Sequence, residues 1–422
     1  MNSNASNTSV GAKTLADVFS GKKLEGKYDY KISDRMTVMQ PSAVREIFKF
    51  LDNPEVISFA GGNPSEDTFP KEELAECSAR LYKEHAANFL QYGVTEGYAP
   101  LRELTLERVS RKFGIVGEND SILMTTGGQQ GIDLTMKCLT NEGDWVACED
   151  PSFIGAINDI RSYRNQFLSV PLDDDGMDVD FLERELETKK IKVIYTIPTF
   201  QNPGGVTMSL ERRKKLYELA VKHDFFILED DPYHEMRCFG EELPPIKSFD
   251  KTGHVIYCGS YSKIIAPGLR VGYLILDKAL LQKFAVAKQC ADVHSCLYPQ
   301  MLIAEYLTHF DIDAHVDLSR KLYAERLTRM LQGLDKHMDP RVKFTRPKGG
   351  FFIWCILPEG NSGAQLCGVL AENRVACVPG STFDPMQWRD KPAFRINYSM
   401  PSLAQIDEGT EIVGRVLREF IK

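Results

Sequence analysis

The stretch Gly259-Ser-Tyr-Ser-Lys-Ile-Ile-Ala-Pro-Gly-Leu-Arg-Val-Gly-Tyr273 places a lysine, Lys263, between two apolar runs. The first run covers 255–259 and the second covers 271–276, and both have the composition of β-strands. Lys263 is therefore expected in a loop that joins two strands of a sheet.

The neighbours of Lys263 suggest what this loop binds. A lysine amine attacks carbonyl groups once its surroundings lower its pKa. The hydroxyls of Ser260 and Ser262 and the fixed charge of Arg270 suit a phosphate monoester. Together these residues indicate pyridoxal 5′-phosphate. The alternative is a surface turn with Arg270 in an ordinary salt bridge, and Ser-x-Ser-Lys alone would favour that alternative.

The complete run Ser-x-Ser-Lys-x-x-x-Pro-Gly-Leu-Arg-x-Gly-Tyr resembles the lysine signature of fold-type I pyridoxal-phosphate-dependent aminotransferases of class I/II. The resemblance extends from about Arg35 to Ser399 and is greatest to the branch of 2-aminoadipate, kynurenine and aromatic aminotransferases. It implies that Lys263 is the catalytic residue, which carries the cofactor and moves the Cα proton of an L-amino acid. The amino group would then pass to a 2-oxo acid, such as 2-oxoglutarate, in a ping-pong reaction.

Seven strand-like runs alternate with helical patterns, which predicts an α/β fold. We expect a three-layer sandwich with a mostly parallel seven-stranded sheet and a smaller α/β C-terminal domain. The runs are 121–126, 145–149, 166–171, 193–197, 225–229, 255–259 and 271–276. No helical pattern separates the last two, so one strand there is expected to be antiparallel. Helices are expected over 279–297, 299–309 and 313–337. The predicted units are 1–55 (arm and first helix), 56–310 (large cofactor-binding domain) and 311–422 (small domain).

Candidate site residues follow the ends of the predicted strands, where open α/β sheets bind their ligands. Gly128 and Gln129 open a helix after the first run, and free backbone N–H groups at such a point bind phosphate. The family usually has serine at the position of Gly128. By the resemblance, Phe153 stacks on the cofactor ring, where the family commonly has tyrosine; a core phenylalanine is the alternative.

Two further strand ends carry polar residues. Asp230 ends an apolar run, and a carboxylate there suits a protonated pyridine nitrogen. The resemblance implies that Asn202 and Tyr233 donate hydrogen bonds to the phenolic oxygen of the cofactor. Asn202 is also expected to contact the substrate.

Arg395 alternates with apolar residues on a predicted strand, so its side chain is expected to point inward, where it needs an anion. In the resembled family this arginine binds the α-carboxylate of the substrate, and an interdomain salt bridge is the alternative. The resemblance also implies that the backbone of Gly62 lies beside this carboxylate; an ordinary Gly-Gly-Asn-Pro turn is the alternative.

Tyr92 directly precedes Gly93 on a predicted loop, with Gly97 a few residues further on. The resemblance implies that its hydroxyl meets the cofactor phosphate of a partner subunit, so we expect a homodimer with shared active sites. Short helices are expected over 14–19 and 42–51 of the N-terminal segment. The resemblance implies that this segment folds over the substrate, so either Arg35 or the region Tyr28–Tyr30 is expected to touch the substrate side chain.

Composition limits the remaining possibilities. The net charge of −8 argues against nucleic acid as a partner, and no apolar run is long enough to span a membrane. Ten scattered cysteines without a Cys-x-x-Cys pair indicate reduced thiols in a cytoplasmic protein, and no metal-binding motif is present. Two rival functions remain: a C–S β-lyase on the same scaffold, and the sensor domain of a transcription regulator. The short N-terminal arm and the acidic charge argue against the regulator.

Overall fold

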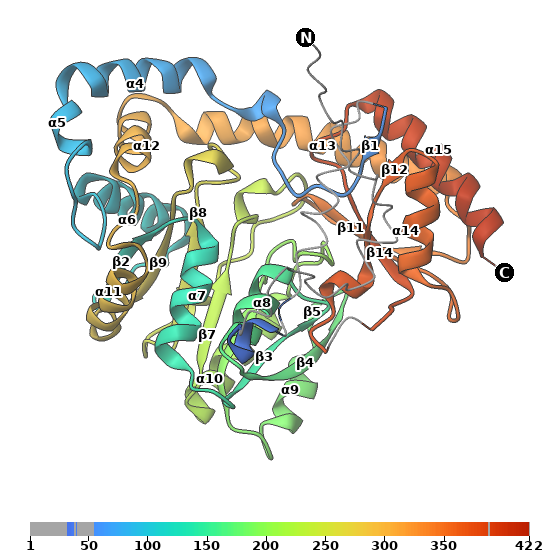
Figure 1. Cartoon of the computed structure of the whole chain (residues 1–422), viewed down its shortest axis with the longest axis horizontal. Coiled ribbons are helices and arrows are strands. Elements are labelled where there is room, and N and C mark those ends of the chain that lie inside the picture. Colours follow the sequence, from blue (N-terminus) through green and yellow to red (C-terminus); the bar gives the residue numbers. More distant parts are fainter. Residues whose placement is uncertain (1–31, 38, 40–54, 387–388, 422) are drawn as a thin grey trace, which may run out of the picture.

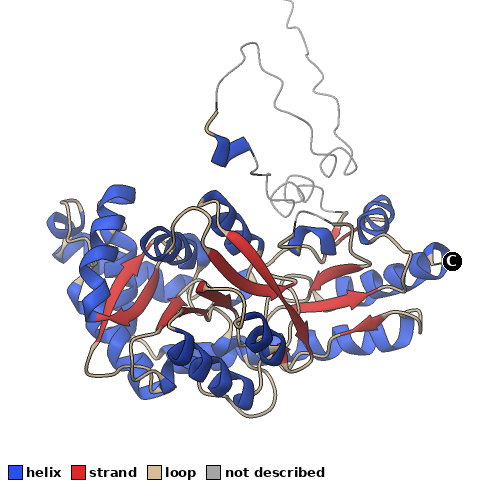
Figure 2. Cartoon of the chain, turned by 90° about the horizontal axis from the view of Figure 1, so that it is seen from below, coloured by secondary structure: helices blue, strands red, loops and turns tan. Residues whose placement is uncertain are grey.

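The computed structural model describes residues 32–37, 39, 55–386 and 389–421 (Figure 1). Its largest element is an eight-stranded sheet in the order β2-β9-β8-β7-β6-β3-β4-β5. The strands are β2 (Asp120–Thr125), β3 (Trp145–Asp150), β4 (Gln166–Asp173), β5 (Gly176–Met177), β6 (Ile191–Thr196), β7 (Phe226–Asp230), β8 (Val255–Ser260) and β9 (Gly272–Asp277). Figure 2 shows these strands between helices.

The sheet confirms the predicted strands and their directions. Strands β4, β3, β6, β7 and β8 pair in parallel, whereas β9 is antiparallel to both β8 and β2. The antiparallel strand expected beside the lysine loop is therefore β9. The eighth strand, β5, was not predicted: it has two residues and pairs antiparallel to β4 at the sheet edge.

Helices cover both faces of the sheet. On β6, Val193 and Tyr195 belong to one hydrophobic core and Ile194 to the other, because successive side chains of a strand point to opposite faces. The first core includes side chains from α7 (Gly128–Leu139) and α8 (Ile154–Ser162). The second includes side chains from α9 (Val179–Glu185) and α10 (Leu210–His223). This arrangement confirms the three-layer sandwich.

The helices that precede and follow the sheet strands lie at one end of the molecule (Figure 1). They are α4 (Lys71–Glu84), α5 (Ala86–Phe89), α6 (Ala99–Phe113), α11 (Lys278–Asp292) and α12 (Leu297–His309). The helix predicted over 279–297 is confirmed as far as Asp292, but its predicted end is wrong: α11 stops there because Val293 has φ 63° and ψ −58°, which no helix contains. The long helix α13 (Ile312–His337) runs from this end toward the C-terminal part.

The C-terminal part contains an antiparallel sheet in the order β10-β11-β14-β13. These strands are β10 (Lys343–Phe344), β11 (Phe352–Ile356), β14 (Ala393–Asn397) and β13 (Val378–Pro379), with α14 (Gly363–Glu372) and α15 (Leu403–Phe420) beside them. The short strand β1 (Ile57–Ser58) pairs in parallel with β12 (Val375–Ala376). Residues 57–58 are thus attached to the C-terminal part, although the predicted large domain includes them; the domain boundaries stay predictions.

Two regions bear on other expectations. The helices expected over 14–19 and 42–51 and the region Tyr28–Tyr30 lie outside the described residues. Arg35 lies in the exposed one-turn helix α2 (Asp34–Thr37), and its role at the substrate stays a prediction. Within the part of the chain that the structure describes, no helix combines the length and apolar character needed to cross a membrane.

Candidate active site

The carboxyl ends of five strands meet at one edge of the large sheet. Strands β3, β6, β7 and β8 run in parallel, and β2 has the same direction because it is antiparallel to β9, which is itself antiparallel to β8. The loops that leave these ends carry the residues predicted from the sequence. Lys263 follows the end of β8, and the C-terminal sheet supplies Arg395 from β14.

The Lys263 amine is half-buried and points at the segment that follows β1. Its Nζ donates a 2.7 Å hydrogen bond to the carbonyl oxygen of Gly62 and lies 5.8 Å from the centre of the Tyr233 ring. Burial lowers the pKa of this amine to about 8. The charges of Arg270 and Arg395 also lower this pKa, whereas Asp230 opposes them. Lys263 is therefore far easier to deprotonate than an ordinary lysine.

A second group of residues forms a seat for an anion at the start of α7. Gly127 has φ 74°, and a Cβ atom there would lie 2.3 Å from Arg270 Nη2, so glycine is required for the guanidinium to approach. Ser260 Oγ donates to Ser262 Oγ at 2.9 Å beside it. Gly128 is the first residue of α7, where backbone N–H groups and the helix dipole favour an anion.

Asp230 lies buried at the end of β7 and accepts a 2.7 Å hydrogen bond from the hydroxyl of Tyr195 on β6. Burial raises the pKa of this carboxyl to about 7, although the Tyr195 hydrogen bond and the Lys263 charge lower it. A Cβ atom on Gly128 would lie 3.8 Å from Asp230 Oδ1, so the carboxylate and the anion seat are close neighbours. A cation bound beside Asp230 would keep this carboxyl ionised.

Arg395 on β14 is 2% exposed and lies close enough to Lys263 for its charge to lower the pKa of that amine. Its Nη1 donates to Asn202 Oδ1 at 2.8 Å and its Nη2 to the carbonyl oxygen of Ala60 at 2.7 Å. The guanidinium carbon lies 4.2 Å from the ring centre of Phe352 and 4.8 Å from that of Phe383.

This guanidinium is a buried cation without an anionic partner among the described residues. Its Nε is buried and makes no hydrogen bond within that part of the chain, and burial lowers the pKa of Arg395 to about 9. Such a cation calls for an anion, and a ligand carboxylate meets that need. The alternative of an interdomain salt bridge is thus not observed.

Three predicted residues lie at the margin of this arrangement. Gln129 Nε2 donates to Asp159 Oδ2 at 2.6 Å, so its side chain faces α8. Phe153 caps α8, and both Phe153 and Gln129 approach Gly155 so closely that a Cβ there would clash with each. Tyr92 is 82% exposed. The assigned roles of all the predicted site residues stay predictions.

Sequence reasoning missed the residues that support the site. Tyr195 holds Asp230, and Phe352 and Phe383 enclose the Arg395 guanidinium. Gln201 Nε2 donates to Glu149 Oε2 at 3.0 Å and to the carbonyl oxygen of Pro151 at 2.8 Å, which joins the loops after β3 and β6. Buried aromatic residues look like ordinary core in a sequence; the one available signal was Glu149, a carboxylate at the end of an apolar run.

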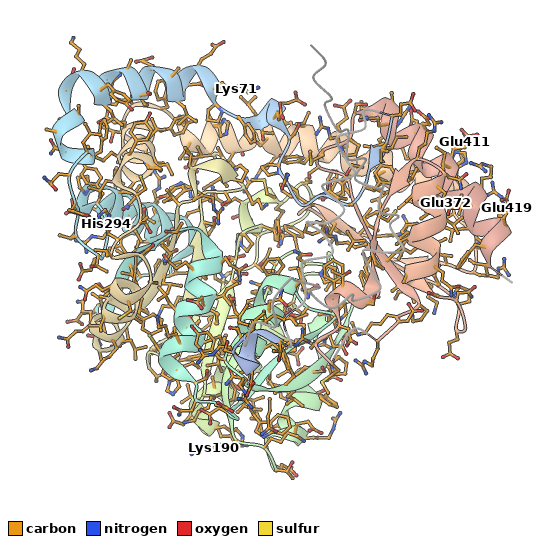
Figure 3. All side chains as sticks on the ribbon, viewed as in Figure 1. Lys71, Lys190, His294, Glu372, Glu411 and Glu419 are labelled. Atoms are coloured by element: carbon orange, nitrogen blue, oxygen red, sulfur yellow. The ribbon has the colours of Figure 1, made fainter. Side chains whose placement is uncertain are left out.

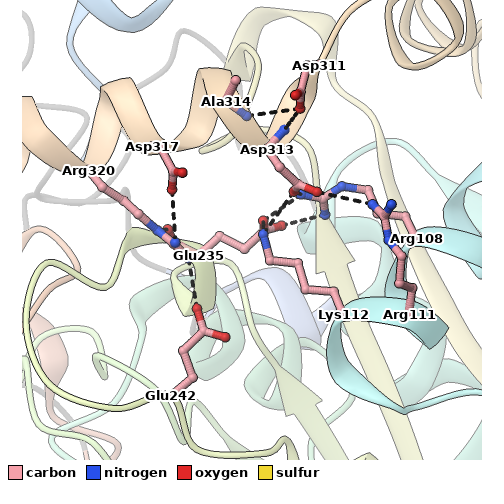
Figure 4. A network of polar contacts seen from close by, with 10 residues as sticks. All are labelled: Arg108, Arg111, Lys112, Glu235, Glu242, Asp311, Asp313, Ala314, Asp317 and Arg320. Atoms are coloured by element: carbon pink, nitrogen blue, oxygen red, sulfur yellow. Dashed lines mark hydrogen bonds and ion pairs between the residues drawn. The ribbon is translucent and has the colours of Figure 1, made fainter.

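A buried ion network anchors the turn that follows Tyr233 (Figure 4). Arg108 on α6 donates two hydrogen bonds to Glu235, at 2.7 and 2.6 Å, and a third to Asp313 on α13. Lys112 also contacts both carboxylates. The network holds α6, α13 and the Tyr233 turn together, and it keeps the pKa of Glu235 lowered to about 2.

Comparison with known proteins identifies the family. The family profile described as "Aminotransferase class I and II" matches residues 54–413. The chain is 38% identical over 401 residues to aromatic-amino-acid aminotransferase 1 of Thermococcus litoralis, covering 94% of this chain and 96% of that protein. The chain belongs to the class I and II aminotransferases, which confirms the resemblance seen in its sequence.

Solved structures agree with this assignment. The kynurenine aminotransferase of Pyrococcus horikoshii, in complex with PMP, KYN as substrates and KYA as products, superimposes with a TM-score of 0.89 at 38% identity, over 93% of this chain and 98% of that chain. LysN, the α-aminoadipate aminotransferase of Thermus thermophilus, complexed with N-(5′-phosphopyridoxyl)-L-leucine, gives a TM-score of 0.86 at 37% identity, over 92% and 97%. The fold-type I class is thereby confirmed, and pyridoxal phosphate is the cofactor of this family.

Proposed function

We propose that this aminotransferase accepts L-amino acids with aromatic or 2-aminoadipate-like side chains and passes their amino group to a 2-oxo acid, chiefly 2-oxoglutarate. The observation that carries the proposal is the guanidinium of Arg395, which is buried between two aromatic rings, has an unpartnered Nε and lies near enough to the Lys263 amine to lower its pKa. An α-carboxylate on Arg395 supplies the missing anion and directs Cα toward the lysine.

The residues around Lys263 fit pyridoxal 5′-phosphate. Arg270, Ser260, Ser262 and the start of α7 suit the phosphate, since together they offer a fixed charge, two hydroxyls and backbone donors. Asp230 suits the ring nitrogen, because its carboxyl has few compensating donors in its buried position. When bound, this cofactor supplies the electron sink for the electrons of the Cα–H bond.

The protein's own groups perform the remaining tasks. Lys263 is the point of covalent attachment and, once released, its amine removes the Cα proton and returns it, which its lowered pKa of about 8 favours. Arg395 holds the substrate carboxylate, and Asn202 fixes the orientation of Arg395 through their hydrogen bond. Tyr233 lies beside Lys263, and its hydroxyl is the donor that we assign to the phenolic oxygen of the cofactor.

The proposed donors follow the named relatives. An aromatic-amino-acid, a kynurenine and an α-aminoadipate aminotransferase are each 37–38% identical to this chain.

The ten cysteines are free thiols, which supports the proposal that the protein works in the cytoplasm.

The proposal includes a homodimer with shared active sites. Leu90, Tyr92 and Val94 are 76%, 82% and 59% exposed on the loop between α5 and α6, and Val293 beside them is 53% exposed. A cavity of about 440 Å³ opens between this loop and Leu297 of α12. Exposed apolar side chains gathered around a cavity are typical of a protein–protein contact, and a second copy of this chain is the occupant that we propose.

A half-reaction tests the proposed function. Single amino acids are added to the cofactor-loaded protein without any oxo acid, and the released oxo acid is measured. We expect one equivalent per site, with kcat/KM for phenylalanine, kynurenine and 2-aminoadipate at least about tenfold above that for alanine in the full reaction. The Lys263→Ala protein should release none. Equal amounts of pyruvate, ammonia and thiol released from an added S-substituted cysteine, with no oxo acid released from the other donors, would instead identify a C–S β-lyase, which uses nearly the same residues.

A further inference from the structure

The four residues Asp292–Ser295 between α11 and α12 form a strained turn. Val293 has φ 63° and ψ −58°, and His294 N donates to the carbonyl oxygen of Asp292 at 2.6 Å. This is a γ-turn of the rare kind, and a β-branched residue with positive φ is a genuine outlier. Such strain persists only where the surroundings hold it in place, and it gathers at functional sites.

One side of this turn holds the anion seat. Asp292 Oδ2 accepts from Thr126 Oγ1 at 2.9 Å and from Gln130 Nε2 at 2.7 Å. The hydroxyls of Ser295 and Thr126 are 2.8 Å apart. The fully buried Lys288 donates to both Asp292 and Ser295. The turn therefore fixes Thr126, which directly precedes the two glycines at the start of α7.

Arg270 is tied to the same point. Its Nη2 donates to the carbonyl oxygen of Thr126 at 3.4 Å and lies against Gly127. A shift of the Asp292–Ser295 turn would thus move the backbone of Thr126 and Gly127, which positions both the anion seat and the guanidinium of Arg270.

The other side of the turn holds the loop of Tyr92. His294, labelled in Figure 3, accepts a 3.2 Å hydrogen bond at Nε2 from the backbone N–H of Gly93. Its Nδ1 lies 2.9 Å from the carbonyl oxygen of Ser295, so the neutral ring carries its proton on Nδ1 and donates it there. The Tyr92 ring packs edge-on against His294 at 5.9 Å. His294 therefore joins the strained turn to the exposed loop.

We propose that His294 is a positioning residue that couples the anion seat of its own subunit to the Tyr92 loop. The inference rests on the proposed function, in which that seat binds the cofactor phosphate and Tyr92 meets the seat of a second copy. Asp292 and Ser295 link His294 to the anion seat. A ligand that fixes the seat therefore also fixes the Tyr92 loop, and a partner that fixes the loop also fixes the seat. Cofactor binding and subunit association should then strengthen one another, because coupling between two sites is reciprocal.

Two substitutions of His294 distinguish the effect of losing its hydrogen-bond acceptor from the effect of changing its side-chain shape. In His294→Gln the side-chain oxygen reaches the position of Nε2 and still accepts from Gly93 N–H. In His294→Asn the shorter amide faces Ser295 O and leaves the Gly93 donor without its acceptor. His309→Asn on α12 is the matched control, because His309 is exposed and contacts Glu305 outside this link.

The measurements use the full-length protein. The dissociation constant of pyridoxal 5′-phosphate is measured by equilibrium dialysis, and that of the subunits by sedimentation. We expect His294→Asn to weaken both by about fivefold to tenfold, the effect of one hydrogen bond, with kcat at saturating cofactor within twofold of wild type. His294→Gln and His309→Asn should stay within twofold in every measurement.

Two results would overturn the coupling. One is a His294→Asn protein that retains cofactor as tightly as wild type, even if its thermal midpoint falls. The other is equal damage in the Gln and Asn variants, which would mean that side-chain shape matters rather than the acceptor. Both leave the proposed function intact, whereas a wild-type protein that binds no pyridoxal 5′-phosphate would refute that function itself.

Discussion

Arg395 and Asn202 are 193 positions apart in the chain, and Arg395 Nη1 donates a 2.8 Å hydrogen bond to Asn202 Oδ1. The contact joins strand β14 of the C-terminal sheet to the loop after β6 of the large sheet. Because Oδ1 of Asn202 faces the guanidinium, its Nδ2 group is the one left to donate elsewhere. The two sheets thus share one polar contact at the point where the substrate carboxylate is proposed to bind.

Substitution of Arg395 by lysine should impair substrate binding selectively. Lysine is a point charge that cannot replace a planar two-pronged donor, so we expect kcat/KM for amino acid donors to fall roughly 100-fold, a loss of about 2.7 kcal/mol. Steady-state kinetics measures this change. Arg346→Lys is the control, because Arg346 is an exposed residue paired with Asp335. The kcat/KM of this variant should stay within twofold of the wild-type value. An Arg395→Lys enzyme with unchanged kcat/KM would refute the role of Arg395.

The lowered pKa of Lys263 predicts unusual reactivity in the cofactor-free protein. Amine reagents attack the unprotonated form, so the labelling rate of Lys263 should rise with pH through a midpoint near 8, whereas ordinary lysines have midpoints above 10. Peptide mass spectrometry after brief labelling gives the rate. Because the charge of Arg270 lowers this pKa, Arg270→Leu should move the midpoint upward. A wild-type midpoint near 10 would contradict the electrostatic environment described.

The strands and the lysine loop could be predicted from sequence because each depends on local pattern. Apolar runs of strand length, separated by helical patterns, define the sheet, and β9 is antiparallel because its loop has no room for a crossover helix. The inward position of Arg395 followed from the two-residue period of a strand. These features need no knowledge of distant contacts.

Other features depend on tertiary contacts and left no local signal. The helix expected over 279–297 breaks at Val293, where neither glycine nor proline marks the end; bonds from Asp292 to Thr126 and Gln130 impose the break. Tyr195 resembles any core residue of a buried strand until Asp230 is placed next to it. The pairing of β1 with β12 joins segments more than 300 residues apart, which no periodicity can indicate.

The buried network around Glu235 should matter more for stability than its exposed neighbours. Arg108 is 6% exposed, and its removal leaves the buried Glu235 carboxylate without its main cationic partner. Arg108→Met should therefore lower the free energy of unfolding by about 3 kcal/mol at pH 7. Arg111→Met removes a 68% exposed partner of Asp313 and should cost less than about 0.5 kcal/mol. Urea unfolding of both variants measures the difference.

The same network has a defined pH dependence. The pKa of Glu235 is lowered from 4.5 to about 2 in the folded protein, so its favourable contribution is complete above pH 4.5 and is lost as the pH falls toward 2. The cost of Arg108→Met should therefore shrink between pH 5 and pH 3. A cost that is the same at both pH values would mean that the guanidinium acts through packing alone.

Removal of the Tyr195 hydroxyl should change how the cofactor-free protein responds to pH. The folded protein holds the Asp230 proton more tightly than the unfolded chain, since burial raises this pKa from 3.8 to about 7. The free energy of unfolding therefore falls as the pH rises from about 4 to about 7 on account of this group. The Tyr195 hydrogen bond lowers the pKa of Asp230, so Tyr195→Phe should raise it further and extend the fall above pH 7. We expect the free energy of unfolding of the variant to fall by about 1–2 kcal/mol more at pH 8.5 than at pH 5.5, measured by urea unfolding.

Tyr298→Phe is the control, because it removes a hydroxyl bonded to Ser78. Its loss of unfolding free energy should be the same at both pH values. If Tyr195→Phe also showed no pH dependence, the hydroxyl would have no influence on the ionisation of Asp230.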